Sequence, residues 1–328
     1  MELPSALRQA VDRLLERTPL AELQRASGVL SGRYRAELRD GRLHLDGALA
    51  VKAYLATRLP ATYAAVRASF ESVADGMPDF SPASLLDVGA GPGTALWAAT
   101  DCWPALSAAV LVEASAAARG AGETLGGDMP KISARWVAGD ATRGLPDVAP
   151  ADLVTLCYVL DELDMAQRAA LVERLWALTA GVLVIVEPGT PAGWQRILGA
   201  RDRLIAAGAH LVAPCPHENP CPLAPPDWCH FSRRVARSRL HRLAKGGDVP
   251  WEDEKFVYVA AARQAVQPPR ARVIAPPRGG KGVVTVKLCK ADGTAAERRL
   301  SKRDGEDFRI ARRLDWGDAV RQDLAGDS

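Results

Sequence analysis

The stretch LLDVGAGPG at residues 85–93 constrains the fold of this chain more than any other part of the sequence. An apolar run that breaks into an aspartate and three alternating glycines predicts a buried strand leading into a tight turn. Gly89, Gly91 and Gly93 allow the backbone to turn sharply and to approach a ligand closely, and a helix predicted at 94–100 would direct its free amides at that ligand. The spacing is not that of a dinucleotide-binding motif, and no Lys-Ser/Thr phosphate clamp follows. The motif therefore disfavours a P-loop and an ordinary NAD site.

Strands and helices alternate from residue 84 onward, as they do in a parallel sheet covered on both faces. The sequence predicts strands at 84–88, 108–113, 132–138, 153–158, 182–187, 210–213 and 256–262, and helices at 94–100, 115–125, 165–178 and 194–208. A long excursion at 214–251 separates the last two strands. This pattern indicates an α/β fold built on seven strands.

The chain divides into three expected regions. Apolar residues at helical spacing in 4–26 and 45–76 predict a helical N-terminal region, 1–80, with a polar loop at 33–42. This region is either a packing layer on the main sheet or a partner-binding layer. The α/β domain spans 81–264 and contains a cysteine-rich insertion at 213–250. A Pro-rich linker then leads to a basic, β-rich extension, 265–328, with a hairpin at Asp292-Gly293 and a short helix.

Charge is distributed unevenly along the chain. Residues 1–230 carry 20 Lys and Arg against 26 Asp and Glu, whereas residues 231–328 carry 22 against 13. The last third is therefore the candidate surface for a polyanion. No run of about 18 apolar residues predicts a membrane span. Acids at Glu2, Asp12 and Glu16 argue against a secretory or transit peptide, and we expect a cytoplasmic monomer.

The glycine motif and the strand pattern together resemble the class I S-adenosylmethionine (SAM)-dependent methyltransferases. The resemblance implies a Rossmann-like sheet whose last strand is antiparallel, with SAM at the carboxyl ends of the strands. The implied SAM-binding residues lie in or after the first three strands. They are Asp87, Gly89, Gly91 and Gly93, then Glu113 for the ribose hydroxyls, and Asp140 and Ala141 for the adenine. Leu160, Asp161 and Glu162 follow the fourth strand, where the methionine end or a substrate would lie.

No catalytic group is evident in the sequence. The Asn/Asp-Pro-Pro-aromatic motif of amino-directed nucleic-acid methyltransferases is absent, and Cys157, inside an apolar strand, is expected to be buried and inert. Whether the protein is an enzyme is left open by the residues. A SAM-dependent rRNA methyltransferase and an inactive relative are both compatible with them.

Three cysteines, Cys215, Cys221 and Cys229, lie in a Pro-rich loop with little helix or strand to order it. Cytoplasmic cysteines seldom form disulfides, so a metal is the candidate ordering agent, with Cys289, His217 or His230 as a fourth ligand. The nearby histidines favour zinc, and free cysteines remain an alternative.

Four segments in order, LLDVGAGPGTALWAA, CPHENPCPL, DWCHFSRR and VTVKLC, resemble the methyltransferase-like proteins of the mitochondrial small ribosomal subunit and their bacterial relatives. The resemblance runs from about residue 30 to the C-terminus. It implies a [4Fe-4S] cluster on Cys215, Cys221, Cys229 and Cys289, and action on the small ribosomal subunit, hence on 16S rRNA, during assembly. A small-molecule SAM-dependent methyltransferase with structural zinc is the alternative.

The segment HFSRRVARSRLHRLAK, 230–245, predicts a helix with Arg233, Arg237, His241 and Lys245 on one stripe. Such a stripe is either a solvated face or an RNA-binding surface of salt-dependent affinity. The predicted RNA-binding residues are Arg233, Arg234, Arg237 and Lys245. A second basic run at 298–313 contributes Arg298, Arg299, Lys302, Arg303, Arg309, Arg312 and Arg313.

Overall fold

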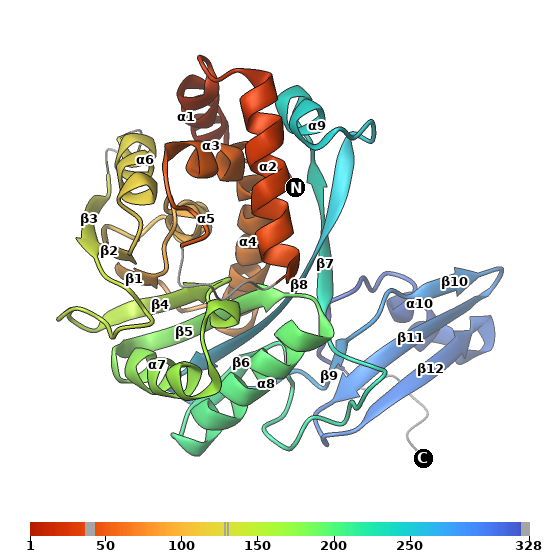
Figure 1. Cartoon of the computed structure of the whole chain (residues 1–328). Coiled ribbons are helices and arrows are strands. Elements are labelled where there is room, and N and C mark those ends of the chain that lie inside the picture. The colour runs from red at the N-terminus through yellow and green to blue at the C-terminus, as the bar shows by residue number, and fades with distance from the viewer. Residues whose placement is uncertain (37–42, 128, 130, 323–328) are drawn as a thin grey trace.

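A mixed sheet of eight strands forms the centre of the computed structural model, which describes residues 1–36, 43–127, 129 and 131–322 (Figure 1). The strand order is β3-β2-β1-β4-β5-β8-β6, and β7 also pairs with β8. The first five strands are parallel, and β8 runs antiparallel to its neighbours. Their bounds are β1 (Ser84–Val88), β2 (Ala108–Glu113), β3 (Ser133–Ala138), β4 (Ala151–Cys157), β5 (Thr179–Pro188), β6 (His210–Ala213), β7 (Phe231–Ala236) and β8 (Trp251–Ala262). This is the topology of the class I methyltransferase fold, so the predicted fold class is confirmed. The sheet has eight strands rather than the predicted seven, because β7 also pairs with β8.

Two apolar cores lie on the two faces of the sheet because successive strand residues point to opposite sides. In β1, Leu85 belongs to the core under α5 (Thr94–Cys102) and α6 (Ala116–Gly126), and Leu86 belongs to the core under α7 (Met165–Ala177) and α8 (Pro191–Ala206). The central strands are apolar on both faces, as a fully covered parallel sheet requires.

The N-terminal helices are part of the first of these cores. They are α1 (Ser5–Leu15), α2 (Leu20–Ala36), α3 (Ala48–Thr57) and α4 (Leu59–Gly76). Helix α4 packs on α5 and on β8, with Phe70 and Val66 completely buried. These helices therefore form a packing layer on the sheet. The polar loop predicted at 33–42 is wrong for its first residues, because α2 continues to Ala36, and residues 37–42 lie outside the described part of the chain.

The basic segment 230–245 is not one helix, which corrects the sequence prediction. Residues Phe231–Ala236 form β7, and only Arg239–Lys245 form a helix, α9, capped by Ser238. The physical reason is long-range pairing. Strand β8 begins at Trp251, earlier than predicted, and places its acidic run opposite the basic run, with Arg233 facing Glu254 and Arg234 facing Asp253. Cross-strand pairs of opposite charge favour this register.

The C-terminal extension forms a second, five-stranded sheet with its own small apolar core (Figure 1). Its strands are β9 (Ala271–Val273), β10 (Arg278–Gly280), β11 (Val283–Lys290), β12 (Ala295–Ser301) and β13 (Ala319–Val320). Strands β11 and β12 form the predicted hairpin around Asp292-Gly293, and the predicted short helix is α10 (Gly305–Ala311). Short 3-10 turns, η1 (Leu160–Glu162) and η2 (Lys302–Asp304), complete the elements. Within the described residues, no helix has the length and apolar character needed to cross a bilayer.

Candidate functional site

The glycine turn after β1 has the backbone conformation that requires glycine. Gly89, Gly91 and Gly93 all have positive φ, at 67°, 53° and 83°. A side chain on Gly89 would place its Cβ 2.4 Å from a methyl group of Val159, so the turn also packs too closely for any other residue there. Gly93 precedes α5 and lies against Trp136 rather than in the cleft, unlike the other two glycines.

A cleft opens beside this turn at the carboxyl ends of the strands, where ligands bind in open α/β sheets. Six of the seven predicted SAM-binding residues line it: Asp87, Gly89, Gly91, Glu113, Asp140 and Ala141. Glu162 from η1 also lines it, whereas Leu160 and Asp161 are buried beneath the turn. The structure thus brings together most of the side chains that the motif and strand ends singled out.

Glu113 fastens the glycine turn to the end of β2. Its carboxylate accepts a hydrogen bond from the Gly91 amide at 2.8 Å and another from the Ser115 amide at 2.7 Å. Burial raises the pKa of Glu113, and these two amide hydrogen bonds oppose that rise. Each carboxylate oxygen has a lone pair left for a ligand hydroxyl.

Asp87 carries an unpartnered oxygen at the floor of the cleft. One carboxylate oxygen accepts the Thr155 hydroxyl at 2.7 Å, whereas the other, Oδ2, is buried and has no hydrogen-bond donor among the described residues. Burial raises the pKa of Asp87 to about 7. A buried oxygen without a hydrogen-bond donor destabilises the folded protein, so a ligand that donates a hydrogen bond to it would be favoured.

Asp140 is turned toward its own loop. Its Oδ1 accepts the amide and the hydroxyl of Thr142 at 2.8 and 2.7 Å, and Arg143 lies 3.6 Å from Oδ2. Asp140 therefore fixes the shape of the loop that forms one wall of the cleft, and the neighbouring Ala141 also lines that wall.

Residues of the N-terminal region form the opposite wall, which the sequence patterns did not predict. Tyr34, His44, Tyr54 and Arg58 line the cleft, and the Tyr54 hydroxyl lies 3.1 Å from that of Thr94 in α5. These residues belong to apolar or irregular segments without a motif. The only available signal was the dense apolar composition of α3, which indicates burial but not a ligand.

The end of β4 joins this wall to β8. Tyr158 has φ 58°, a strained conformation for a residue other than glycine, and its hydroxyl donates to Glu254 at 3.1 Å. Arg58 donates to the same carboxylate at 3.3 Å. Cys157 lines the cleft, so it is not the fully buried core residue that the sequence predicted. Its thiol is nevertheless shielded from solvent, and this burial raises its pKa well above the usual value.

Burial raises the pKa of Glu162 to about 8, with nearby Asp161 acting in the same direction, and His44 lies 3.7 Å away. The half-buried Glu162 carboxyl therefore ionises less readily than an ordinary glutamate. Because its pKa is raised and its side chain lines the cleft, Glu162 is a candidate to contact a ligand.

The four cysteines Cys215, Cys221, Cys229 and Cys289 line one apolar cavity between α8, β8 and the C-terminal sheet. Three come from the loop after β6, and Cys289 comes from β11. His217 lies in the same cavity with Nε2 3.3 Å from the Cys289 sulfur, whereas His230 stacks on Trp228 instead. Among the described residues, no three His, Cys, Asp or Glu side chains are arranged to hold a metal ion.

Two buried arginines also line the cysteine cavity. Arg201 is 1% exposed and donates to the carbonyls of His217 and Asn219, but its Nε has no partner among the described residues. Arg272 is 4% exposed, lies opposite Cys289 in the sheet, and donates to the Pro214 carbonyl at 2.9 Å. Arg201 is paired with the adjacent Asp202 at 2.8 Å, whereas Arg272 forms no ion pair with an acid among the described residues, so negative charge in the cavity would stabilise Arg272.

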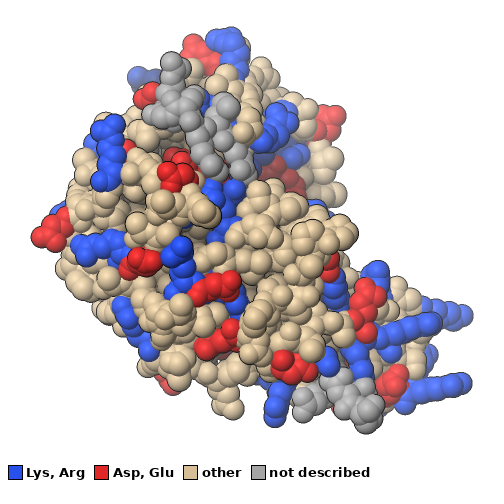
Figure 2. All heavy atoms as spheres, turned by 60° about the horizontal axis from the view of Figure 1, so that its bottom comes forward, with Lys and Arg blue, Asp and Glu red and all other residues tan. Residues whose placement is uncertain are grey.

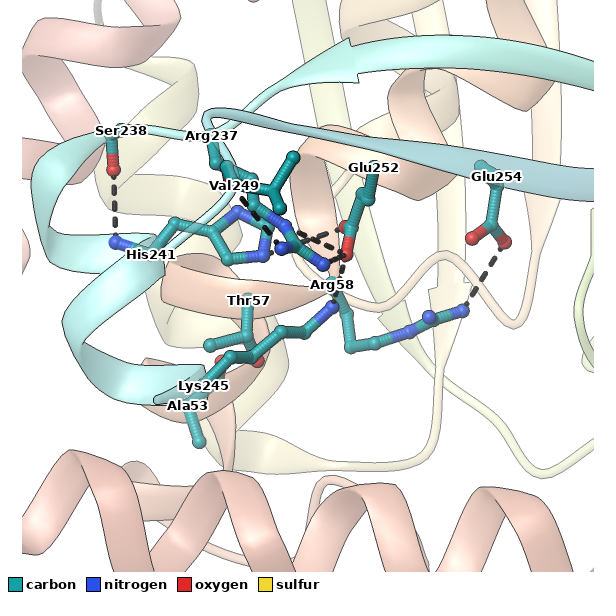
Figure 3. A network of polar contacts seen from close by, with 10 residues as sticks. All are labelled: Ala53, Thr57, Arg58, Arg237, Ser238, His241, Lys245, Val249, Glu252 and Glu254. Atoms are coloured by element: carbon teal, nitrogen blue, oxygen red, sulfur yellow. Dashed lines mark hydrogen bonds and ion pairs between the residues drawn. The ribbon is translucent and has the colours of Figure 1, made fainter. Parts of the chain in front are cut away.

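The predicted RNA-binding residues of β7 and α9 are held in ion pairs. Figure 3 shows Arg237 and Lys245 converging on Glu252, at 2.8 and 2.7 Å, with the buried His241 beside them at 3.4 Å. Arg233 pairs with Glu71 of α4, and Arg234 pairs with Asp253. Of the four, Arg234 is the most exposed. The structure thus gives this segment a structural role that the sequence did not reveal.

Replacing Glu252 with alanine is expected to destabilise the fold by about 2–3 kcal/mol, because it leaves two partly buried cations without their carboxylate. Urea denaturation measures the change. Asp253→Ala is the matched control on the adjacent residue, since it removes only an exposed pair worth less than about 1 kcal/mol. Equal losses in the two variants would contradict the structural role of the Glu252 cluster.

A family model described as "Mitochondrial small ribosomal subunit Rsm22" matches residues 48–321. The human "Ribosome assembly protein METTL17, mitochondrial" is 32% identical over 286 residues, covering 81% of this chain and 61% of that protein. "Rsm22-cox11 tandem protein 2, mitochondrial" of Schizosaccharomyces pombe is 24% identical over 321 residues, covering 82% and 42%. The chain thus spans less than two thirds of the length of either relative.

Among solved structures, the chain is similar to an O-methyltransferase family protein from Burkholderia thailandensis (TM-score 0.44, 15% identity, 75% of this chain and 72% of that one). It is also similar to magnesium protoporphyrin IX methyltransferase from Synechocystis PCC 6803 with bound SAH (TM-score 0.42, 13% identity, 71% and 94%). The family match begins at α3 and extends over the central sheet, the cysteine loop and the C-terminal sheet. The chain therefore belongs to the Rsm22 family of the mitochondrial small ribosomal subunit.

Proposed function

We propose that this protein binds SAM in the cleft beside the glycine turn and engages small-subunit rRNA during ribosome assembly, as a methyltransferase-like monomer. The observation that carries the cofactor part is the buried, unpartnered Oδ2 of Asp87 at the floor of the cleft. An ammonium group, such as that of the methionine part of SAM, would supply the missing donor. The ribose would lie at Glu113 and the adenine beside Asp140 and Ala141.

SAM supplies an electrophilic methyl group to whichever acceptor is brought to it. The chain's own residues bind and orient that group. The glycine turn allows close approach, Glu113 holds the turn, and Tyr54 and Arg58 close the cleft from the N-terminal side. An rRNA acceptor would then enter on the side of Glu162.

The ribosomal part of the proposal rests on family membership and on the relative named as a ribosome assembly protein. The two relatives named above are described as mitochondrial, and the cytoplasmic location expected from the acidic residues of the N-terminal segment stays a prediction. Co-sedimentation of the purified protein with 30S subunits and with their assembly intermediates tests this part. Enrichment on the intermediates is the expected result, and absence from both would contradict it.

The cysteine cavity is proposed to hold a [4Fe-4S] cluster. Four cysteines from two separate segments of the chain line this cavity, and four thiolates are the usual ligand set of such a cluster. The buried Arg272 would offset part of the negative charge of four thiolates, whereas Arg201 already pairs with Asp202.

Asp87→Asn is expected to weaken SAM binding by about tenfold, because a neutral amide loses a charge-assisted hydrogen bond worth about 1.5–3 kcal/mol while keeping an acceptor for Thr155. Isothermal titration calorimetry measures the change. The exposed Asp147→Asn, outside the cleft, is the matched control. Equal affinity in the two variants would remove Asp87 from the site.

The same experiment has a pH dependence of defined sign. The pKa of Asp87 is raised to about 7, so its carboxyl takes up a proton as the pH falls through that value. Only the ionised form attracts an ammonium group, and SAM affinity of the unaltered protein should fall below pH 7. Asp87→Asn should lack this fall, and a similar slope in both proteins would assign the titration to another group.

A further inference from the structure

Some exposed cations of the C-terminal sheet differ from the cations of β7 and α9, because they form no ion pair with an acid among the described residues. Six of its basic side chains are exposed and come from the β10–β11 turn, β12, η2 and the residues after α10: Lys281, Arg299, Lys302, Arg303, Arg312 and Arg313. Within the described ranges, no ion pair joins any of them to an acid. Figure 2 shows Lys and Arg side chains extending from this end of the molecule. Unpaired cations keep their charge available for an external anion.

A groove runs between the β10–β11 hairpin and the end of α10. Gly279, Gly280 and Gly282 form part of its lining, so backbone is exposed there without side chains to block an approaching ligand. Lys302 and Arg312 line the same groove from η2 and from the residue after α10. The groove therefore combines an open glycine edge with two positive charges.

Both exposed cations contact neighbouring residues of this sheet. The Lys302 amide donates to the Gly282 carbonyl at 3.2 Å, and the Lys302 side chain passes over Gly282, whose φ of 75° forms the tight turn. The Arg312 guanidinium lies 5.6 Å from the ring centre of Phe308, which is buried in the core of this sheet. Preorganised side chains lose less conformational entropy on binding than free ones.

We propose that this groove binds the phosphate backbone of RNA, an inference that rests on the proposed function and gives its RNA-binding site a location. Two features favour RNA backbone over bases. The groove's aromatic residue, Phe308, is buried and offers no exposed ring for stacking, and the lining side chains are cations suited to phosphate. Binding is then tolerant of sequence and sensitive to salt. Asp315, which also lines the groove, opposes it.

The test uses the full chain and a fluorescein-labelled, unstructured RNA oligonucleotide of mixed sequence, followed by fluorescence anisotropy over a range of salt concentrations. The double variant Lys302→Gln/Arg312→Gln should bind about tenfold more weakly. Its salt slope should fall by about 1.4 units, since each phosphate contact on a single strand contributes about 0.7. Asp315→Asn should bind about twofold more tightly, because it removes the opposing charge.

The matched control is Arg278→Gln/Arg309→Gln, which removes two cations of the same sheet that are paired with Glu297 and Glu306. Its affinity should stay within twofold of the unaltered protein. Equal losses of RNA affinity in both double variants would show that only net charge matters, and would contradict RNA binding in the groove. Polyglutamate that competes as well as RNA at equal charge would overturn the assignment to RNA.

The outcomes separate this inference from the proposed function. If Lys302→Gln/Arg312→Gln binds RNA as tightly as the unaltered protein, the groove is not the RNA-binding site, and the proposed engagement of rRNA is unaffected. If the unaltered protein neither binds RNA nor co-sediments with 30S intermediates, both the groove and the proposed ribosomal function are contradicted. All the substituted side chains are exposed, and an unchanged thermal unfolding midpoint shows that each variant is folded.

Discussion

Glu113→Ala is expected to raise the dissociation constant for SAM by about 100-fold. The substitution removes the acceptor proposed for the ribose and also frees the Gly91 and Ser115 amides, so the glycine turn loses its attachment to β2. Two charge-assisted hydrogen bonds at about 1.5 kcal/mol each correspond to about two decades of affinity. Calorimetry on the purified variant gives the value directly.

Glu123→Ala is the matched control for this substitution. Glu123 lies on α6, shortly after Glu113 in the chain, and is exposed outside the cleft, so its removal should leave affinity unchanged within about twofold. Circular dichroism shows whether the Glu113 variant is folded. A folded Glu113→Ala protein with undiminished affinity would move SAM out of this cleft.

The sheet could be predicted because its signals are local. Each parallel strand is a short apolar run bounded by polar or glycine residues, and the observed strands agree with the predicted ones within a few residues. The glycine motif likewise fixes the turn after β1 through backbone conformation alone, as the positive φ of Gly89 and Gly91 shows. Carboxylates at the ends of parallel strands then necessarily approach one edge of the sheet, which is why Glu113 and Asp140 share a cleft.

The missed features depend on contacts between residues far apart in the chain. Viewed alone, 230–245 has helical spacing of its cations, but the acidic run at 252–254 offers a strand partner, and pairing with β8 overrides the local preference. Tyr54 and Arg58 reach the cleft only because α3 and α4 pack against α5 and α6. No local pattern encodes that placement, so this wall of the cleft could not be predicted from the sequence.

The cysteine site could be predicted only in part. Spacing groups Cys215, Cys221 and Cys229 in one loop, but only the family resemblance linked them to Cys289, 60 residues after Cys229. In the structure, β11 carries Cys289 into the same cavity, and Arg272 on the neighbouring strand donates to the carbonyl of Pro214 in the cysteine loop. The C-terminal sheet is thus docked on the loop by at least one direct contact besides any shared group.

Cys289→Ser is expected to lower the iron and acid-labile sulfide content of anaerobically purified protein by about tenfold, because a three-cysteine site leaves one iron of the proposed cubane without thiolate. The half-buried Cys102→Ser, at the end of α5 and outside the cavity, is the matched control and should retain the full content. SAM affinity should be unchanged in both variants, since the SAM cleft and the cysteine cavity share no lining residue.

Loss of the cluster should also loosen the C-terminal sheet. Ligation by Cys289 closes a long loop of chain, and breaking it returns conformational entropy to the tail, opposed by the Arg272 and Asn219 hydrogen bonds that remain. Limited proteolysis in the linker 263–270 should therefore be faster in Cys289→Ser than in Cys102→Ser. One zinc per chain without sulfide in the unaltered protein would rule out the cluster, and full sulfide in Cys289→Ser would show that another side chain, with His217 the nearest, completes the site.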